Sequence, residues 1–363
     1  MYVVTNRELN EGKTGLALFG DTPNILGPNE LRLVKVTRHA SGYSTELLAD
    51  RLAPSEVEAI KQRHALKALD PLLPWYASLR VACEVMEQAQ KEQRHVLVYV
   101  HGYNNDMADV IKTAEELEAL YKVVVVPFSW PANGGGPVSG TASYLDDKRD
   151  ARVSMDALNR FVEKAQFYHA LLTESYRDRV WEQANRAHPD NPGAAREAFS
   201  ARLARHCQVT LNLVCHSMGS YVLKYALGPS SAATRELVFD NVCLAAADAN
   251  NPDHPQWVER IQVRNRLYVV INEDDYALAW SRRKPGQEQL DRLGSYLRNL
   301  VARNAHYVDV TGAPWVKNAH GYFTGQPIEK NAALRRFFAA AFEGERGEPD
   351  LRYAADINAY RLR

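Results

Sequence analysis

Residues 209–219 read Val-Thr-Leu-Asn-Leu-Val-Cys-His-Ser-Met-Gly, an apolar run that leads directly into Ser217. The apolar part, Val209–Val214, is typical of a buried strand. A buried strand that turns sharply into a helix, with serine at the bend, holds that serine in strained geometry and points its hydroxyl away from the sheet. Gly219 lets the new helix pack close to the strand, whereas Cys215 departs from the usual Gly-x-Ser-x-Gly pattern. The stretch predicts that Ser217 is a nucleophile.

Further apolar runs recur along the chain and are separated by segments long enough to hold a helix. Together with Val209–Val214, the full set of apolar runs is Val96–Val100, Val123–Phe128, Val209–Val214, Val242–Ala247, Leu267–Ile271 and Tyr307–Val310. Such runs suit strands buried on both faces, as in a parallel sheet covered by helices. Apolar stripes at helical spacing lie at residues 72–86, 155–172 and 334–342. This alternation predicts an α/β fold with a mostly parallel, doubly wound sheet.

Residues 1–345 are expected to form a single domain. Its first 70 residues are less regular, and Tyr2–Thr5 and Leu31–Thr37 are predicted to be edge strands that need not run parallel to the others. The segment 346–363 is polar and is expected to form a loosely ordered tail.

An excursion at 132–206 interrupts the strand–helix alternation. It begins with the glycine-rich stretch 132–140 and continues with sequence rich in Arg, Glu and Ala. Residues 173–206 are expected to be helical and to lie above the sheet. Two alternatives stay open for them: a lid over the active site, or a solvated hairpin unconnected with substrate.

The composition is that of an ordinary globular protein, with 46% hydrophobic and 24% charged residues. Lys+Arg and Asp+Glu both number 44, so no basic excess points to a nucleic acid partner. No apolar stretch approaches the roughly 20 residues that span a bilayer, and no secretory signal is visible at the start. The cysteines lack metal-ligand spacing; they are Cys83, Cys207, Cys215 and Cys243. These features predict a cytoplasmic protein that needs no metal or cofactor.

A serine hydroxyl becomes a strong nucleophile only when a base takes its proton and an acid orients that base. In sheets that carry the serine on a sharp strand–helix turn, the acid and then the histidine follow on loops after later strands. The acids at strand ends after Ser217 are Asp248 and the cluster Glu273-Asp274-Asp275.

The histidines after Ser217 differ in their place relative to the strands. His254 lies only a few residues beyond the strand that ends at Asp248, and His306 precedes a strand, at the wrong end of the sheet. His320 follows the last predicted strand on a loop. The topology therefore selects His320 as the base, with Asp274 or Asp275 as its acid.

The oxyanion of an acyl-transfer intermediate needs two preorganised donors. The backbone N–H of Met218, at the start of the helix after the serine, is one candidate. The second is the N–H of Tyr103, because Val96–Val100 runs straight into His101-Gly102 and glycine allows close backbone approach. The Tyr103 ring either donates through its hydroxyl or only packs.

Four residues near these loops are candidates for lining a substrate pocket: His101, Gly102, Trp130 and Tyr144. Ordinary core packing is an equally good interpretation of the two large aromatic residues.

These stretches resemble an uncharacterised, largely bacterial family of α/β-hydrolases, known as domain of unknown function nine hundred. The resemblance runs from about Val98 to Phe323, with the opening Val-Thr-Asn-Arg at 4–7 as a further match. The matching segments are 100–105, 128–131, Tyr144 with Asp147, Ala151 and Ser154, 216–219, 246–248, Asp275-Tyr-Ala-Leu278 with Ser281, 292–294 and 320–323. The resemblance implies an α/β-hydrolase fold with Ser217 as nucleophile, His320 as base and Asp275, rather than Asp274, as the acid.

The residues and the resemblance together predict a serine hydrolase that cleaves a carboxylic ester through an acyl-enzyme. The expected substrate is a small-molecule or lipid-like acyl compound, and the choice of ester rests on analogy with the fold. Two alternatives remain: an amidase or peptidase with the same site, and a hydrolase-like scaffold that serves as a protein-interaction module. Nothing in the sequence indicates a particular protein partner.

Overall fold

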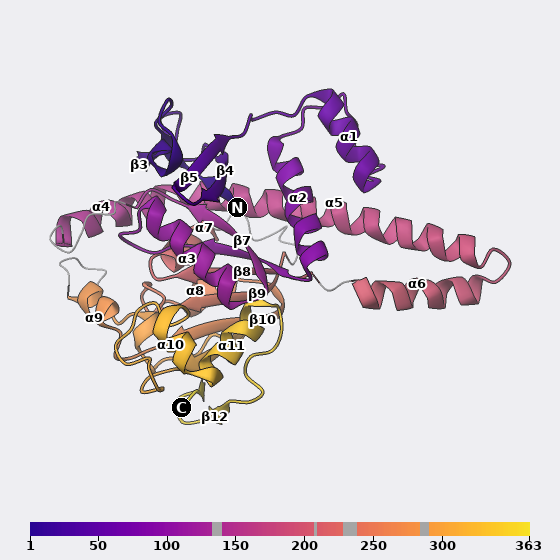
Figure 1. The fold of residues 1–363 in the computed structure, drawn as a ribbon. Helices are drawn as coiled ribbons and strands as arrows, with labels where there is room; N and C mark the ends of the chain where they lie inside the picture. Colours follow the sequence, from indigo (N-terminus) through magenta and orange to yellow (C-terminus); the bar gives the residue numbers. More distant parts are fainter. Residues whose placement is uncertain (133–139, 207–208, 228–237, 284–289) are drawn as a thin grey trace.

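The centre of the molecule is a twisted sheet with helices on both faces, seen in the computed structural model in Figure 1. The structure describes residues 1–132, 140–206, 209–227, 238–283 and 290–363. Six neighbouring strands of the sheet are all parallel. In spatial order they are β7 (Val123–Ser129), β6 (His95–Val100), β8 (Leu211–His216), β9 (Phe239–Ala245), β10 (Val263–Ile271) and β11 (Ala305–Asp309). The predicted mostly parallel α/β sheet is confirmed, and each predicted apolar run contributes one of these strands.

The N-terminal segment extends the sheet beyond β7. The strand β1 (Tyr2–Thr5) pairs parallel with β7 and antiparallel with β4 (Arg32–His39), and β5 (Gly42–Leu47) then forms the edge. The strands β1 and β4 are thus both inner strands, contrary to the prediction that they lie at the edge. The alternate residues of β1 face opposite apolar cores, since Val3 is in one and Val4 in the other. A separate two-stranded sheet joins β2 (Arg7–Leu9) to β3 (Phe19–Pro23).

The C-terminal segment closes the opposite side of the sheet, and the expectation of a loosely ordered tail is wrong. The strand β13 (Ala359–Arg361) pairs parallel with β11, and β12 (Arg352–Ala354) pairs antiparallel with β13. Backbone pairing at the edge of a sheet needs no long apolar run, which is why composition missed it. Leu362 is nonetheless buried, and Arg363 forms a 2.9 Å ion pair with Asp309.

Helices cover both faces of the sheet, because alternate residues of each buried strand point to opposite sides. One core lies beneath α1 (Pro54–His64), α2 (Ala77–Glu92), α4 (Gly140–Val153), α5 (Met155–Ala187), α7 (Gly219–Ala226) and α8 (Pro255–Val258). The other lies beneath α3 (Met107–Leu120), α9 (Tyr276–Arg282), α10 (Gly325–Lys330) and α11 (Ala332–Phe342). The apolar stripe predicted from residue 72 begins later, at α2, because Pro71 and Pro74 occupy the turn before it.

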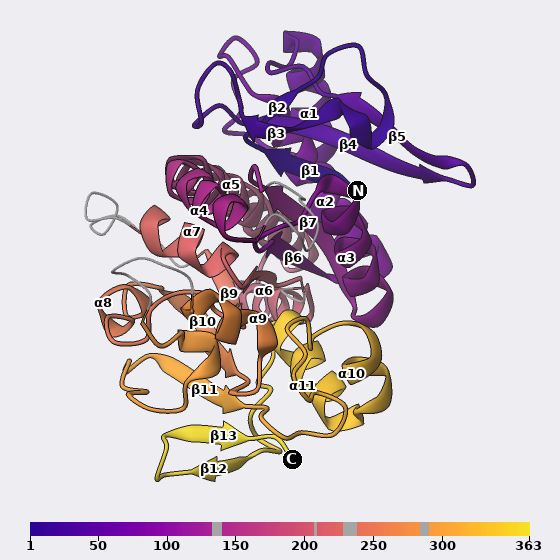
Figure 2. The same cartoon turned by 90° about the vertical axis from the view of Figure 1, so that its left-hand side faces the viewer.

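The helical excursion leads away from the end of the sheet that carries Ser217. The helix α5 continues into α6 (Pro192–His206), and α6 ends just before β8, at the amino end of that strand. Ser217 follows the opposite, carboxyl end. Figure 1 shows the α5–α6 hairpin projecting on the side away from α4 and α9, and Figure 2 views the molecule from that other side. Residues 173–206 therefore do not form a lid over Ser217.

No helix in the described part of the chain combines the length and apolar character that crossing a bilayer would require. Cys83, Cys215 and Cys243 are buried free thiols. Cys207 and residues 133–139 of the predicted glycine-rich loop lie outside the described residues.

Candidate active site

Ser217 lies at the bend between β8 and α7, at the centre of the sheet. Its φ of +52° is in the left-handed region, which a residue with a side chain adopts only at a cost of about 1–3 kcal/mol. The end of β9 holds it there: the Ser217 N–H donates to the Ala245 carbonyl at 2.9 Å, and the Asp248 N–H donates to the Ser217 carbonyl at 3.1 Å. A Cβ on Gly219 would lie 2.5 Å from the Val100 carbonyl oxygen, so α7 can start here only from glycine.

Cys215, the mismatch in the motif, is accommodated without strain. Its side chain is fully buried in the apolar core, and burial raises the pKa of its thiol well above the usual value. The thiol therefore stays protonated, which is the unreactive form of a cysteine.

His320 and Asp275 meet at the same edge of the sheet, from the loop after β11 and the end of β10. The His320 Nδ1–H donates to Asp275 Oδ2 at 2.7 Å, which leaves Nε2 of the neutral ring as a proton acceptor. Asp275 is fully buried and also starts α9, because its Oδ1 accepts the N–H groups of Ala277 and Leu278. Asp274 is exposed, and no hydrogen bond joins it to His320.

His320 lies beside the turn that carries Ser217, where it contacts His216, the residue before the serine. The rings of His216 and His320 are 4.5 Å apart, and His216 Nε2 lies 3.3 Å from the His320 carbonyl oxygen. Among the described residues, no hydrogen bond joins the Ser217 hydroxyl to the His320 ring. Hydrogen bonds of this kind are often long in enzymes without substrate and tighten in the reacting complex.

The loop after β6 packs directly against the serine. A Cβ on Gly102 would lie 2.8 Å from Ser217 Cβ and 3.3 Å from its Oγ, so the approach requires glycine. Asn104 adopts φ +58°, and its N–H donates to Asp147 Oδ2 at 3.2 Å. These contacts fix the backbone on both sides of Tyr103. No acceptor for the Met218 N–H is found in the part of the chain that the structure describes.

His101 and Trp130 support this loop from behind and are fully buried, so the expectation that they line a pocket is wrong. Their rings stack 5.1 Å apart, and the Trp130 Nε1–H donates to the His101 carbonyl at 2.9 Å. The Trp130 N–H donates to His101 Nε2, so Nδ1 carries the proton that is shared with the Gly102 carbonyl. Burial, assisted by the charge of Arg7, lowers the pKa of His101 to about 3.

Arg7 is a fully buried cation for which no role was predicted. Its guanidinium donates to the carbonyl of Asn105 at 2.9 Å, to that of Ala132 at 3.2 Å and to the Ser129 hydroxyl at 2.8 Å. It therefore ties the loop after β6 to the loop after β7. The sequence feature that could have pointed to Arg7 is its place in the opening Val-Thr-Asn-Arg segment that matches the family. For Asp147, the corresponding feature is its place near Tyr144 in another matching segment.

Tyr144 belongs to a buried polar network rather than to a pocket wall. Its hydroxyl donates to Asp248 Oδ2 at 3.1 Å, and Asp248 Oδ1 accepts from the Ser281 hydroxyl at 2.7 Å and from Arg292 Nε at 3.0 Å. The Tyr103 ring packs edge-on against Tyr144, with centroids 5.5 Å apart. Asp248 thus forms its ion pair with Arg292, a permanent cation, and does not contact His320.

The other two histidines lie elsewhere. His254 is buried, and its ring nitrogens bond the Asn251 carbonyl and the Tyr307 hydroxyl, both at 2.6 Å. His306 lies within β11 near its amino end, stacked 6.2 Å from Tyr360. Of the three candidates, only His320 reaches the carboxyl edge.

Comparison with known families agrees with this architecture. Residues 80–169 match the model of a family described as alpha/beta hydrolase of unknown function (DUF900). The matched segment holds β6, the loop from His101 to Asn105 and the Phe128–Pro131 stretch, and it ends before Ser217. The resemblance to that family is confirmed over this segment, and the chain carries an α/β-hydrolase scaffold. No curated protein matches the chain.

Proposed function

We propose that this protein is a serine hydrolase that cleaves carboxylic esters. Ser217 would be the nucleophile, His320 the base and Asp275 the acid that orients the base. The observation that carries the proposal is the 2.7 Å bond between His320 Nδ1 and buried Asp275 Oδ2, beside a serine held at φ +52°. A structural histidine has no need of a strained serine beside it, whereas acyl transfer uses both.

In the first half-reaction, the Ser217 Oγ attacks the ester carbonyl carbon while His320 Nε2 takes the hydroxyl proton. Asp275 keeps the ring in the tautomer with the proton on Nδ1 and stabilises the imidazolium that forms. The negative charge moves to the carbonyl oxygen, where the N–H groups of Met218 and Tyr103 would donate. Collapse of this intermediate expels the alcohol, which receives the proton from His320.

In the second half-reaction, water attacks the acyl group on Ser217. His320 Nε2 takes a proton from that water and returns it to Ser217 Oγ as the acid leaves. The buried supports of the loop, His101 and Arg7, take no part in these transfers and only position the backbone around Tyr103.

The acyl substrate is proposed by analogy with the fold, and esters are favoured over amides on the same ground. A chain-length series of p-nitrophenyl esters, with p-nitroanilides in parallel, measures the size of the acyl pocket and the class of leaving group. Faster turnover of the anilides than of matched esters would make the protein an amidase.

The identity of the nucleophile is tested by labelling with a fluorophosphonate probe, which reacts with activated serines. Wild type should be labelled, and Ser217→Ala should not. Ser220→Ala is the matched control: its hydroxyl, three residues away on α7, bonds the Cys215 carbonyl, so this variant should label as wild type does.

Labelling of Ser217→Ala at the wild-type level contradicts the proposal. Absence of labelling and of turnover on esters, thioesters and amides would instead favour the scaffold that binds a protein partner.

A further inference from the structure

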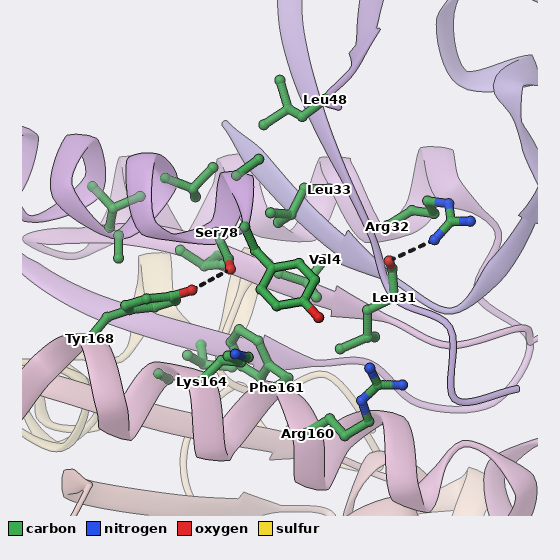
Figure 3. Close-up of a pocket in the computed structure, with 18 of the residues that line it drawn as sticks. Val4, Leu31, Arg32, Leu33, Leu48, Ser78, Arg160, Phe161, Lys164 and Tyr168 are labelled. Atoms are coloured by element: carbon green, nitrogen blue, oxygen red, sulfur yellow. Dashed lines mark hydrogen bonds between the residues drawn. The ribbon is translucent and has the colours of Figure 1, made fainter. Parts of the chain in front are cut away.

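A cavity of about 420 Å³ lies between α2, α5 and the sheet, at a distance from Ser217. Its floor is the sheet face formed by Val96 and Val98 of β6, Val126 of β7 and Val4 of β1. Figure 3 shows Phe161 and Lys164 rising from α5 on one side, with Leu33 and Leu48 on the other. Its volume lies within the range of about 300–1,000 Å³ that is typical of small-molecule sites.

The cavity is separate from the proposed catalytic site. Its floor reaches Val98, and at about 3.3 Å per residue the strand runs on for about 10 Å before it reaches His101. The intervening space is packed: Val100 and Phe128 are fully buried, and the Phe161 ring lies 5.9 Å from that of Phe128. An occupant of this cavity would therefore not contact Ser217.

The inner part of the cavity is lined mainly by apolar side chains, and these side chains are buried. Besides the floor, the inner wall includes Val81 and Val85 of α2 and Leu211 at the start of β8. Polar groups interrupt this lining at two places: the hydroxyls of Ser78 and Tyr168, which hydrogen-bond each other at 2.8 Å (Figure 3), and the half-buried ring of His169. Because the hydroxyls bind each other, the interior suits a hydrocarbon chain rather than a polar ligand.

The rim, in contrast, carries exposed cations. Arg51 stacks 3.9 Å above the Tyr76 ring and Lys164 lies 4.7 Å from the same ring, while Arg160 bonds the Asn29 carbonyl. No carboxylate lies within 4 Å of these three cations in the described ranges. Arg32 differs, because Glu30 and Asp50 lie 3.4 and 3.7 Å from it. The mouth of the cavity therefore has positive charge that the protein itself does not neutralise.

We propose that this cavity binds a medium-chain fatty acid. The hydrocarbon chain would lie along the valine floor, and the carboxylate would meet Arg160 and Lys164 at the rim, where charge-assisted hydrogen bonds form. This ligand matches an apolar interior that opens beside unpaired cations. The site goes beyond the proposed ester hydrolysis and does not depend on it.

The test is isothermal titration calorimetry of the full chain with octanoic, decanoic and dodecanoic acids, each below its micelle concentration. Affinity should rise about fourfold with each added methylene, equivalent to about 0.8 kcal/mol, as the chain enters the cavity. Dodecanol, which lacks the charge, should bind at least tenfold more weakly than dodecanoic acid. Absence of binding, or equal binding of the alcohol and the acid, overturns the proposal.

Variants locate the site. Ala165→Phe, which projects a ring from α5 into the cavity, should lower the affinity for dodecanoic acid more than tenfold. The double variant Arg160→Ala, Lys164→Ala should lower it about tenfold while leaving dodecanol unchanged, and as a surface change it keeps the test valid if Ala165→Phe fails to fold. Arg177→Ala, an exposed cation on α5 outside the cavity, is the matched control.

Ser217→Ala separates the two proposals. It should bind dodecanoic acid as tightly as wild type even though it loses fluorophosphonate labelling. Loss of binding in Ser217→Ala would assign the ligand to the serine site. Unchanged binding in a folded Ala165→Phe variant would show that the ligand does not occupy this cavity, and either result refutes the proposed second site.

Discussion

Two buried aspartates lie at neighbouring strand ends of the same sheet, and they differ in what faces them. Asp248, after β9, bonds Arg292 at 3.0 Å, and the two side chains are 3% and 2% exposed. Asp275, after β10, bonds His320, whose side chain is 18% exposed. The first carboxylate faces a permanent charge sealed from solvent, and the second faces a group that can gain and lose a proton in contact with solvent.

This difference suggests different roles for two aspartates at one edge of the sheet, a structural role for Asp248 and a role in proton transfer for Asp275. A carboxylate buried against arginine takes no part in proton transfer. Removing either partner of such a pair strongly destabilises the protein, because it leaves the other charge buried alone. A carboxylate that orients a histidine contributes little to stability but a great deal to proton transfer. The contrast predicts that the same substitution, aspartate to asparagine, has opposite consequences at the two positions.

The largest expected effect is on turnover in Asp275→Asn. Asparagine keeps an Oδ1 that can accept from the N–H groups of α9, but its amide cannot hold His320 with the proton on Nδ1. We expect kcat on a p-nitrophenyl ester to fall about 10³–10⁴-fold, with the free energy of unfolding changed by only about 1 kcal/mol. Steady-state kinetics and urea unfolding measure the two quantities on the same preparation.

Asp274→Asn is the matched control for that measurement, because Asp274 is the exposed neighbour. It should keep kcat within a few-fold of wild type. A larger loss at Asp274 than at Asp275 would contradict the assignment of the acid.

The next effect is on stability in Asp248→Asn. This variant leaves the Arg292 guanidinium buried without its counter-charge, which typically costs about 3–5 kcal/mol. We expect a lower urea midpoint with an unchanged slope, and kcat reduced less than tenfold while the protein is folded.

An exposed ion pair nearby provides the comparison. Arg282 and Asp291 form a 2.7 Å pair in which Arg282 is 59% exposed, so Asp291→Asn should cost at most about 1 kcal/mol. If Asp248→Asn were as mild as Asp291→Asn, Asp248 would not be the structural member of the two buried aspartates.

Sequence predicted the middle of this fold well and its two sides poorly. The parallel strands from β6 to β11 bury both faces and therefore leave continuous apolar runs. The outer strands β12 and β13 have few apolar residues, because one edge is open and pairing is made by the backbone. The direction of the α5–α6 hairpin was also beyond reach, since helical spacing shows which residues share a face and not where the helix points.

At the candidate site, chain order was sufficient to single out His320 and to narrow its partner to Asp274 or Asp275, and the family resemblance favoured Asp275, the one that bonds His320 in the structure. Chain order could not give their supports, because a buried arginine such as Arg7 looks like any surface arginine in a sequence. Nor could it tell that Trp130 and Tyr144 lie behind the site: an aromatic residue near a loop packs inward or outward depending on neighbours that come from other strands.

The smallest expected effect concerns the histidine on the buried side of Ser217. In the folded state the pKa of His101 is lowered to about 3, because the ring is buried and lies in the field of the Arg7 charge. In the unfolded chain its pKa is near 6.5. Between these values the unfolded state binds more protons than the folded state, so stability must fall as the pH is lowered from about 6.5 towards 3.

The contribution of His101 is isolated by comparing wild type with His101→Gln in urea unfolding at pH 8 and pH 5. A glutamine amide can bond both the Trp130 N–H and the Gly102 carbonyl but does not titrate. At about 1.36 kcal/mol per pH unit, wild type should lose about 2 kcal/mol more than the variant over this range. Trp130→Phe removes the indole bond to the His101 carbonyl and should lower stability equally at both pH values. If wild type and His101→Gln lost the same stability, His101 would be protonated in the folded protein as easily as in the unfolded chain. The buried side of Ser217 would then not hold its histidine neutral, and the contrast with the His320 side would fail.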